Sequence, residues 1–189
     1  MSQHQHFRRL AAGLEPAAAI AELQQRPELW SLIQLRQEYA GSAHADTETI
    51  VLRGPDTTEN LFDNLDAFNY PYFAELTAVM ALIQKAIAPL HARDIGRVMI
   101  VKLKAGGEIT PHTDEGAYAR YFARFHLVLE SSPPCLFTAG PETVHMAPGE
   151  LWWFNHQVEH SVVNNGPDRT HIIIDLSAPG FTGALGRPA

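Results

Sequence analysis

The pattern of hydrophobic residues changes character near residue 95 of the 189-residue chain. Before that point, apolar residues recur largely every three or four positions, which is the period of an amphipathic α-helix. Pro16 and Pro27 suit first helical turns, so short helices are expected after them. The segment 72–90 has the strongest helical stripe and is expected to form a helix that Pro89 limits. One short strand is expected at 47–53.

From residue 94 onward, the chain reads as short β-like runs separated by Gly, Pro, Ser and Asn. Many short strands in so few residues favour a closed sandwich or barrel over a parallel sheet, with the preceding helices packed on one outer face. The runs are 97–103, 124–129, 135–138, 143–146, 150–154, 161–163 and 170–176.

Neither an internal repeat nor a linker divides the sequence, so a single domain over 1–189 is expected. Within it, residues 1–94 are expected to form a helical support and the substrate side. Residues 95–177 are expected to form the β core. Residues 178–189, rich in Gly and Pro, are expected to be a loose surface tail.

Composition narrows the possible partners. Hydrophobic residues make up 46% of the chain and charged residues 19%, as in ordinary folded proteins. The formal net charge is −7 without a basic block, which argues against nucleic-acid binding. Cys135 is the single cysteine, so neither an intrachain disulfide nor a cysteine-rich zinc site is expected. No signal-like or membrane-spanning segment is present in the sequence, so a cytoplasmic location and no membrane partner are expected.

A candidate metal site begins at His112 and Asp114, which follow a β-like run. Residues two apart in extended backbone point to the same side, so both side chains can reach one ion. His160, at the start of a later run, is the expected third ligand. Two histidines and one carboxylate on one face of iron leave positions open for a co-substrate and oxygen. His156 is the competing third ligand, but its i, i+4 spacing to His160 suits a helix rather than strands and a turn.

Arg169 lies nine residues after His160, at the start of the last strong strand. A dicarboxylate bound to the metal by its near end needs a cation at its far end, and a guanidinium supplies one with a bidentate fork. Alternatively, Arg169 is an ordinary solvent-exposed charge that pairs with Asp168. Together, the spacing of the three ligands and Arg169 in an all-β context indicates a metal-dependent enzyme that uses a dicarboxylate.

The chain resembles the aspartyl/asparaginyl β-hydroxylase family, including its bacterial proline and amino-acid hydroxylases. Three stretches carry the resemblance, together with His160 and Arg169: 107–114, 124–127 and 149–155. The resemblance implies a double-stranded β-helix (jelly-roll, cupin-like) fold with Fe(II), 2-oxoglutarate and O₂. The implied reaction hydroxylates an unactivated C–H bond and releases succinate and CO₂.

The resemblance also implies roles for individual residues. His112, Asp114 and His160 match the iron ligands, and Arg169 matches the residue that pairs with the far carboxylate of 2-oxoglutarate. Arg124 and His126 match a pair that lines the co-substrate site. They lie two apart in an extended run, hence on one face of the sheet, which suits convergence on a small acid.

Two rival functions remain open from the sequence. A cupin-like metal enzyme would bind the metal without using 2-oxoglutarate, and a non-catalytic β-barrel would only bind a small acid. If the chain is a hydroxylase, its expected substrate is an amino acid with Asp-, Asn- or Pro-like character. That substrate could be free, carried on another protein, or part of a peptide.

Overall fold

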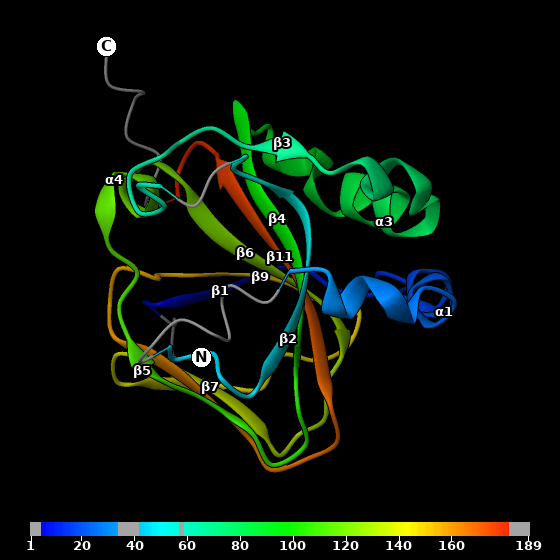
Figure 1. Cartoon of the computed structure of the whole chain (residues 1–189). Coiled ribbons are helices and arrows are strands. Elements are labelled where there is room, and N and C mark those ends of the chain that lie inside the picture. The colour runs from blue at the N-terminus through cyan, green and yellow to red at the C-terminus, as the bar shows by residue number, and fades with distance from the viewer. Residues whose placement is uncertain (1–4, 34–41, 57–58, 182–189) are drawn as a thin grey trace.

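Two antiparallel β-sheets facing each other make up the body of the protein in this computed structural model (Figure 1). The structure describes residues 5–33, 42–56 and 59–181. The larger sheet has seven strands in the order β1-β9-β6-β11-β4-β2-β3, and the smaller has four in the order β5-β10-β7-β8. This arrangement is the double-stranded β-helix, or jelly roll, that was expected.

The larger sheet is formed by strands from both halves of the chain. Its central strand, β11, pairs with β4 on one side and with β6 on the other. The strands are β1 (Phe7–Ala11), β2 (Thr47–Gly54), β3 (Phe68–Asn69), β4 (Asp94–Leu103), β6 (Ala123–Glu130), β9 (Leu151–Phe154) and β11 (Arg169–Ser177).

The smaller sheet brings together segments that are distant in sequence. β10 lies between β5 and β7, and β8 pairs with the other edge of β7. The strands are β5 (Glu108–His112), β7 (Cys135–Ala139), β8 (Glu142–Val144) and β10 (His160–Asn164).

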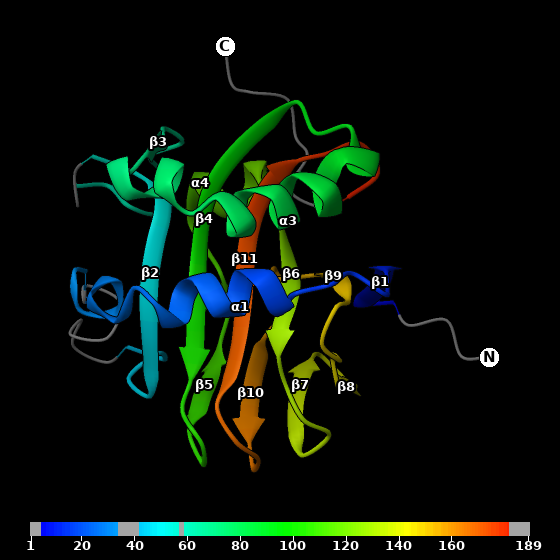
Figure 2. The same ribbon diagram turned by 90° about the vertical axis from the view of Figure 1, so that its right-hand side faces the viewer.

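Helices cover the outer face of the larger sheet. Figure 2 shows α1 and α3 running across its central strands. Buried apolar residues of both helices form one core with Ile100 of β4, Leu127 of β6 and Ile172 of β11. The helical elements are α1 (Ala17–Gln24), the 3₁₀ turns η1 (Pro27–Ser31), η2 (Pro71–Glu75) and η3 (Ala88–Leu90), α3 (Thr77–Ile87), and α4 (Gly116–Tyr121), which lies apart from the others near the end of β5.

A second core fills the space between the two sheets and is more polar at one end. Phe137 of β7 and Phe154 of β9 meet there with ring centroids 4.7 Å apart. Along β11, Ile172, Ile174 and Leu176 belong to the helix-side core, whereas Arg169 and Ile173 line the pocket between the sheets. This alternation follows from the period of two in a strand, and it places polar side chains of β11 inside the molecule.

The N-terminal half contributes more strands to the larger sheet than the single one expected. The strand expected at 47–53 is present as β2, but β1 and β3 also come from this half and lie in the larger sheet. β1 pairs with the edge of β9 that faces away from β6. The backbone partners of β1 are therefore distant in sequence, and no local pattern indicates them. The expected helix at 72–90 is split into η2, α3 and η3.

The expectation of a loose tail from residue 178 is wrong for Ala178 and Phe181. Ala178 is fully buried, and the ring of Phe181 packs 5.0 Å from that of Phe125. Residues 182–189 lie outside the described residues.

Among the described helices, none has the length and apolar character needed to cross a membrane.

Candidate metal centre and active site

The smaller sheet brings His112 and His160 together. His112 ends β5, His160 begins β10, and the two are direct partners in the antiparallel register. Their ring centroids lie 4.3 Å apart. Strand pairing therefore overcomes the 48-residue separation that the sequence leaves between them.

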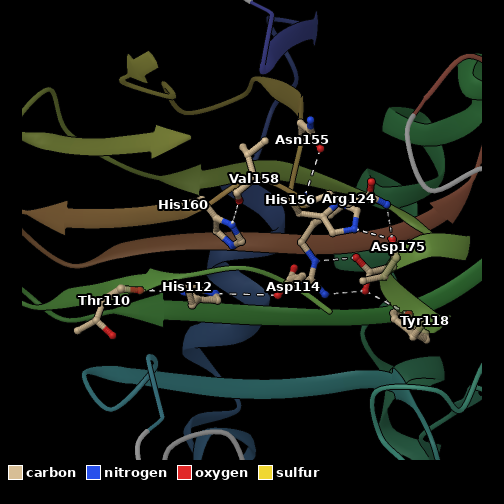
Figure 3. A network of polar contacts seen from close by, with 12 residues as sticks. Thr110, His112, Asp114, Tyr118, Arg124, Asn155, His156, Val158, His160 and Asp175 are labelled. Carbon is tan, nitrogen blue, oxygen red and sulfur yellow. Dashed lines mark hydrogen bonds and ion pairs between the residues drawn. The ribbon is translucent and has the colours of Figure 1, made fainter. Parts of the chain in front are cut away.

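Backbone carbonyl groups orient both imidazoles in the same way. Nδ1 of His112 lies 2.8 Å from the carbonyl oxygen of Thr110, and Nδ1 of His160 lies 3.0 Å from that of Val158 (Figure 3). A carbonyl oxygen only accepts hydrogen bonds, so Nδ1 carries the proton in each ring. In a neutral ring with this tautomer, the lone pair of Nε2 is free, which is the arrangement of a histidine prepared to bind a metal.

Asp114 lies just beyond the end of β5 and completes the cluster. Its backbone N–H donates to the carbonyl oxygen of His156 at 3.2 Å, which holds this turn against the loop before β10. Its Oδ1 lies 4.0 Å from Nε2 of His112. One ligand atom from each of His112, Asp114 and His160 lies within 4.8 Å of the other two, so one ion can reach all three.

Arg124 connects this cluster to the interior of the larger sheet (Figure 3). Its Nη1 donates to Oδ2 of Asp114 at 2.6 Å, which leaves Oδ1 available to a metal. Its Nε and Nη2 donate to the two carboxylate oxygens of Asp175, at 2.9 and 3.0 Å. The hydroxyl of Tyr118 donates to Asp175 at 3.1 Å and thereby extends the network to α4.

The electrostatics of the cluster favour a bound cation. Burial opposes ionisation of Asp114, but Arg124 and the nearby imidazoles prevail and hold the pKa of this carboxyl well below its usual range. Burial, more than any other cause, lowers the pKa of His160 to about 4. Near neutral pH the site therefore offers one carboxylate and a neutral imidazole from His160, which suits a divalent metal.

Arg169 lies deeper in the same pocket, which His112, His160, Arg124 and His126 also line. Only 1% of Arg169 is exposed, and burial lowers the pKa of its guanidinium to about 10. In the described part of the chain, no carboxylate pairs with it. Asp168, the alternative partner, instead accepts from the backbone N–H of Ala105. A buried cation without an anion is costly, so this pocket is prepared for an anionic ligand.

Several buried nitrogen atoms near Arg169 lack hydrogen-bond partners among the described residues. They include Nη1 of Arg169, Nε2 of His126 and Nε2 of His171. Nδ1 of His126 lies 3.4 Å from Nη2 of Arg169. Orphaned polar atoms are unusual in a folded interior, and these three belong to side chains that contact one another around Arg169.

His156, the alternative third ligand, lies outside the metal-ligand cluster. Its Nε2 donates to the carbonyl oxygen of Ala119 at 2.9 Å. Its imidazole is buried and ties α4 to the loop before β10.

The structure brings together all six residues expected from the sequence: His112, Asp114, His160, Arg124, His126 and Arg169.

Sequence reasoning missed Asp175, Tyr118 and His171. Asp175 and His171 could have been found from the alternation along β11, since both share the inward face with Arg169. Tyr118 gave no such signal, because α4 is too short to show a helical period.

A second hollow, of about 290 Å³, lies on the helix-covered side of the larger sheet, beside Trp30 and Lys102. It is separate from the residues of the metal-ligand cluster and from Arg169.

Comparison with known sequences places the chain in a family. The family model described as aspartyl/asparaginyl β-hydroxylase matches residues 24–179, so the pattern reaches well into the N-terminal half. An L-proline cis-4-hydroxylase of Rhizobium meliloti (strain 1021) is 32% identical over 83 residues, which cover 43% of this chain. The same alignment spans only 30% of that relative's length.

The fold agrees with that of one solved structure. An oxidoreductase of the 2OG-Fe(II) oxygenase family from Burkholderia pseudomallei has a TM-score of 0.53 and 14% identity, over 98% of this chain and 100% of that one. A prolyl-4-hydroxylase from Pseudomonas putida has a TM-score of 0.48 and 15% identity, over 91% of this chain and 92% of that one. By its sequence match, the chain belongs to the aspartyl/asparaginyl β-hydroxylase family.

Proposed function

We propose that this protein is an Fe(II)- and 2-oxoglutarate-dependent dioxygenase that hydroxylates a C–H bond of an amino acid. One observation carries the proposal: a His-Asp-His cluster shares a pocket with a buried arginine that has no carboxylate partner among the described residues. The cluster suits a divalent metal, and the arginine suits the far end of a dicarboxylate.

The donor set fits iron. His112 and His160 each present a free Nε2, and Asp114 presents Oδ1 while Arg124 holds Oδ2. Bound Fe(II) would supply oxygen-activating chemistry, in which 2-oxoglutarate is oxidised to succinate and CO₂ while a substrate C–H bond is hydroxylated. The protein's own part is to place the reactants and to keep water from the pocket.

The remaining residues divide into two roles. Arg169 binds the far carboxylate of 2-oxoglutarate through Nη1, and His126, whose Nε2 is also without a partner, lines the same end of the pocket. Arg124 also lines the pocket, but its nitrogen atoms are engaged by Asp114 and Asp175. Its contribution to co-substrate binding is therefore made chiefly through the orientation of Asp114.

We propose a small amino acid as the substrate, by analogy with the L-proline cis-4-hydroxylase relative. An amino acid carried on another protein or within a peptide is the alternative. The proposed location is cytoplasmic.

The test is succinate formation from 2-oxoglutarate by protein reconstituted anaerobically with Fe(II) and then exposed to O₂. Wild type is compared with His112→Ala and Arg169→Met, with and without a panel of free amino acids and short peptides. Arg26→Ala is the matched control, because Arg26 lies on the helical layer and pairs with Glu28 and Glu75.

We expect iron-dependent succinate that disappears in His112→Ala and requires a much higher 2-oxoglutarate concentration in Arg169→Met. The panel member that accelerates turnover and gains one oxygen atom, detected by mass spectrometry, identifies the substrate class. Binding of Fe(II) without any binding of 2-oxoglutarate would exclude this proposal and favour a cupin-like metal enzyme. Binding of 2-oxoglutarate without turnover of any panel member would favour a non-catalytic small-acid-binding protein.

A further inference from the structure

His171 lies directly beside the buried arginine of the pocket. Arg169 and His171 are two residues apart in β11, so their side chains leave the same face of the larger sheet. Nη2 of Arg169 lies 2.7 Å from Nδ1 of His171. A guanidinium only donates hydrogen bonds, so Nδ1 of His171 is the acceptor in this contact.

The protonation state of His171 follows from this contact. With Nδ1 accepting, the single proton of the neutral ring is on Nε2. Burial, followed by the charge of Arg169, holds the pKa of His171 well below its ordinary value. The ring is therefore neutral near pH 7, and the acceptor remains available to the guanidinium.

This hydrogen bond determines which part of the guanidinium is free. Nη2 is engaged by His171 and lies within 3.4 Å of Nδ1 of His126, whereas Nη1 is buried without a partner among the described residues. Arginine has many rotamers, and fixing one of them before a ligand arrives lowers the entropy cost of binding. His171 itself is not among the residues that line the pocket.

We propose that His171 is a positioning residue that holds Arg169 in the conformation that binds the far carboxylate of the co-substrate. This inference rests on the proposed function of Arg169. His171 is proposed to act through Arg169. It belongs neither to the metal-ligand cluster nor to the residues that line the pocket, although its Nδ1 also lies 3.2 Å from Nδ1 of His126, which does line it. Its removal is expected to weaken binding of a dicarboxylate while binding of a monocarboxylate stays the same.

Two variants with the same side-chain branching separate the hydrogen bond from packing. In His171→Asn, the amide oxygen can take the place of Nδ1 as an acceptor for Arg169. In His171→Leu, a side chain of similar volume offers no acceptor. Ile172→Val is the control on the same strand, because Ile172 faces the helix-side core.

The measurement is equilibrium binding to Zn(II)-loaded protein without O₂, by calorimetry. The two probes are 2-oxoglutarate and 2-oxopentanoate, in which a methyl group replaces the far carboxylate. We expect His171→Leu to bind 2-oxoglutarate about tenfold or more weakly, as for loss of a hydrogen bond to a charged group. His171→Asn should stay within about threefold of wild type, and all proteins should bind 2-oxopentanoate alike.

Equal 2-oxoglutarate affinities for the Asn and Leu variants would overturn the inference. Loss of both ligands in the Leu variant would overturn it as well, because it would assign His171 a structural role. If His171→Leu does not fold, His171→Met takes its place, since the flexible thioether adapts to irregular space. Wild type that binds both probes equally well would instead contradict the role of Arg169 in the proposed function.

Discussion

Arg124 is the residue on which the geometry of the metal-ligand cluster depends most. It lies between Asp114 and Asp175 and donates three hydrogen bonds to them. Burial acts to lower the pKa of its guanidinium, but the two carboxylates outweigh burial and raise it. Because a planar guanidinium holds both carboxylates at once, a lysine of the same charge is a poor replacement.

We expect Arg124→Lys to weaken metal binding by about tenfold or more, the usual effect of removing a group that orients a metal ligand. The physical reason is that one ammonium group cannot contact Asp114 and Asp175 together in the arginine's geometry. Competition against a chromogenic chelator, with Co(II) and without O₂, measures the change.

Arg26→Lys serves as the control for Arg124→Lys, because it makes the same chemical change on the helical layer. Unaltered Co(II) affinity in Arg124→Lys, with thermal stability equal to wild type, would show that Arg124 does not orient Asp114. A loss of affinity in the control as well would point to a general effect on folding.

Local spacing predicted the polar residues that belong to a motif, namely the His-x-Asp pair and the arginine nine residues after the distal histidine. His112 and Asp114 are two apart in extended backbone, and Arg169 begins the last strong strand. Their identity and spacing indicated one pocket. Asp175 and His171 were not predicted, because neither belongs to a motif. The partner of Asp175, Arg124, reaches it only through the pairing of β6 with β11, whereas His171 shares a face of β11 with Arg169.

At the scale of elements, a side chain of α1 satisfies the N-terminus of α3 and so joins the two main helices. Leu76, at the N-terminal end of α3, provides no side-chain cap. Glu22 of α1 replaces it: its carboxylate accepts from the backbone N–H groups of Ala78 and Val79, at 2.9–3.1 Å. A carboxylate at a helix N-terminus satisfies free N–H groups and complements the helix dipole.

We expect Glu22→Ala to lower the free energy of unfolding by about 1–2 kcal/mol, as for loss of a helix cap. Urea denaturation at pH 7.5 measures the change. Because α1 and α3 lie on the face opposite the pocket, Co(II) affinity should remain that of wild type.

Glu15→Ala is the matched control for Glu22→Ala, since Glu15 is exposed just before α1. An equal and small effect of both substitutions would mean that Glu22 does not cap α3. Loss of Co(II) binding in Glu22→Ala would mean that the helical layer contributes to the metal site.

All seven β-like runs predicted in the second half correspond to strands of the structure. Short β-like runs bounded by turn residues are a local property of the sequence, which explains this success. β1 and α4 were missed for different reasons. β1 contains two arginines and takes its backbone partners from β9, and α4 has only six residues, too few for a readable period.

At the scale of the whole molecule, the structure buries several histidines in their neutral form. Burial is the main cause that lowers the pKa values of His126, His156, His160 and His171. In the unfolded chain these imidazoles regain an ordinary pKa near 6.5. Below that pH the unfolded state binds more protons than the folded state. The free energy of unfolding therefore decreases as the pH is lowered.

We therefore expect the metal-free protein to lose stability steeply between pH 6.5 and 5, with each such histidine contributing up to about 1.4 kcal/mol per pH unit. For His160, whose folded pKa is about 4, the loss continues down to that value. Asp114 adds to the loss only below about pH 4, because its pKa is lowered in the folded state. Urea denaturation in the presence of EDTA, at pH 7.5, 6.5 and 5.5, tests this.

The substitution His171→Asn removes one of these groups and should make the dependence on pH shallower. Ile172→Val, which removes no titratable group, should shift the curve without changing its slope. A free energy of unfolding that is constant from pH 7.5 to 5.5 in wild type would contradict the burial of neutral histidines.

The sequence alone determined the class of fold, most strands of the second half and the residue types of the metal-ligand cluster, because periodicity and short spacings are local. Tertiary structure decided the rest. The pairing of β5 with β10 makes His112 and His160 neighbours, and the antiparallel register of β6 and β11 makes Asp175 the partner of Arg124. These contacts join residues 45 or more positions apart, so their formation depends on strand register and burial rather than on local sequence.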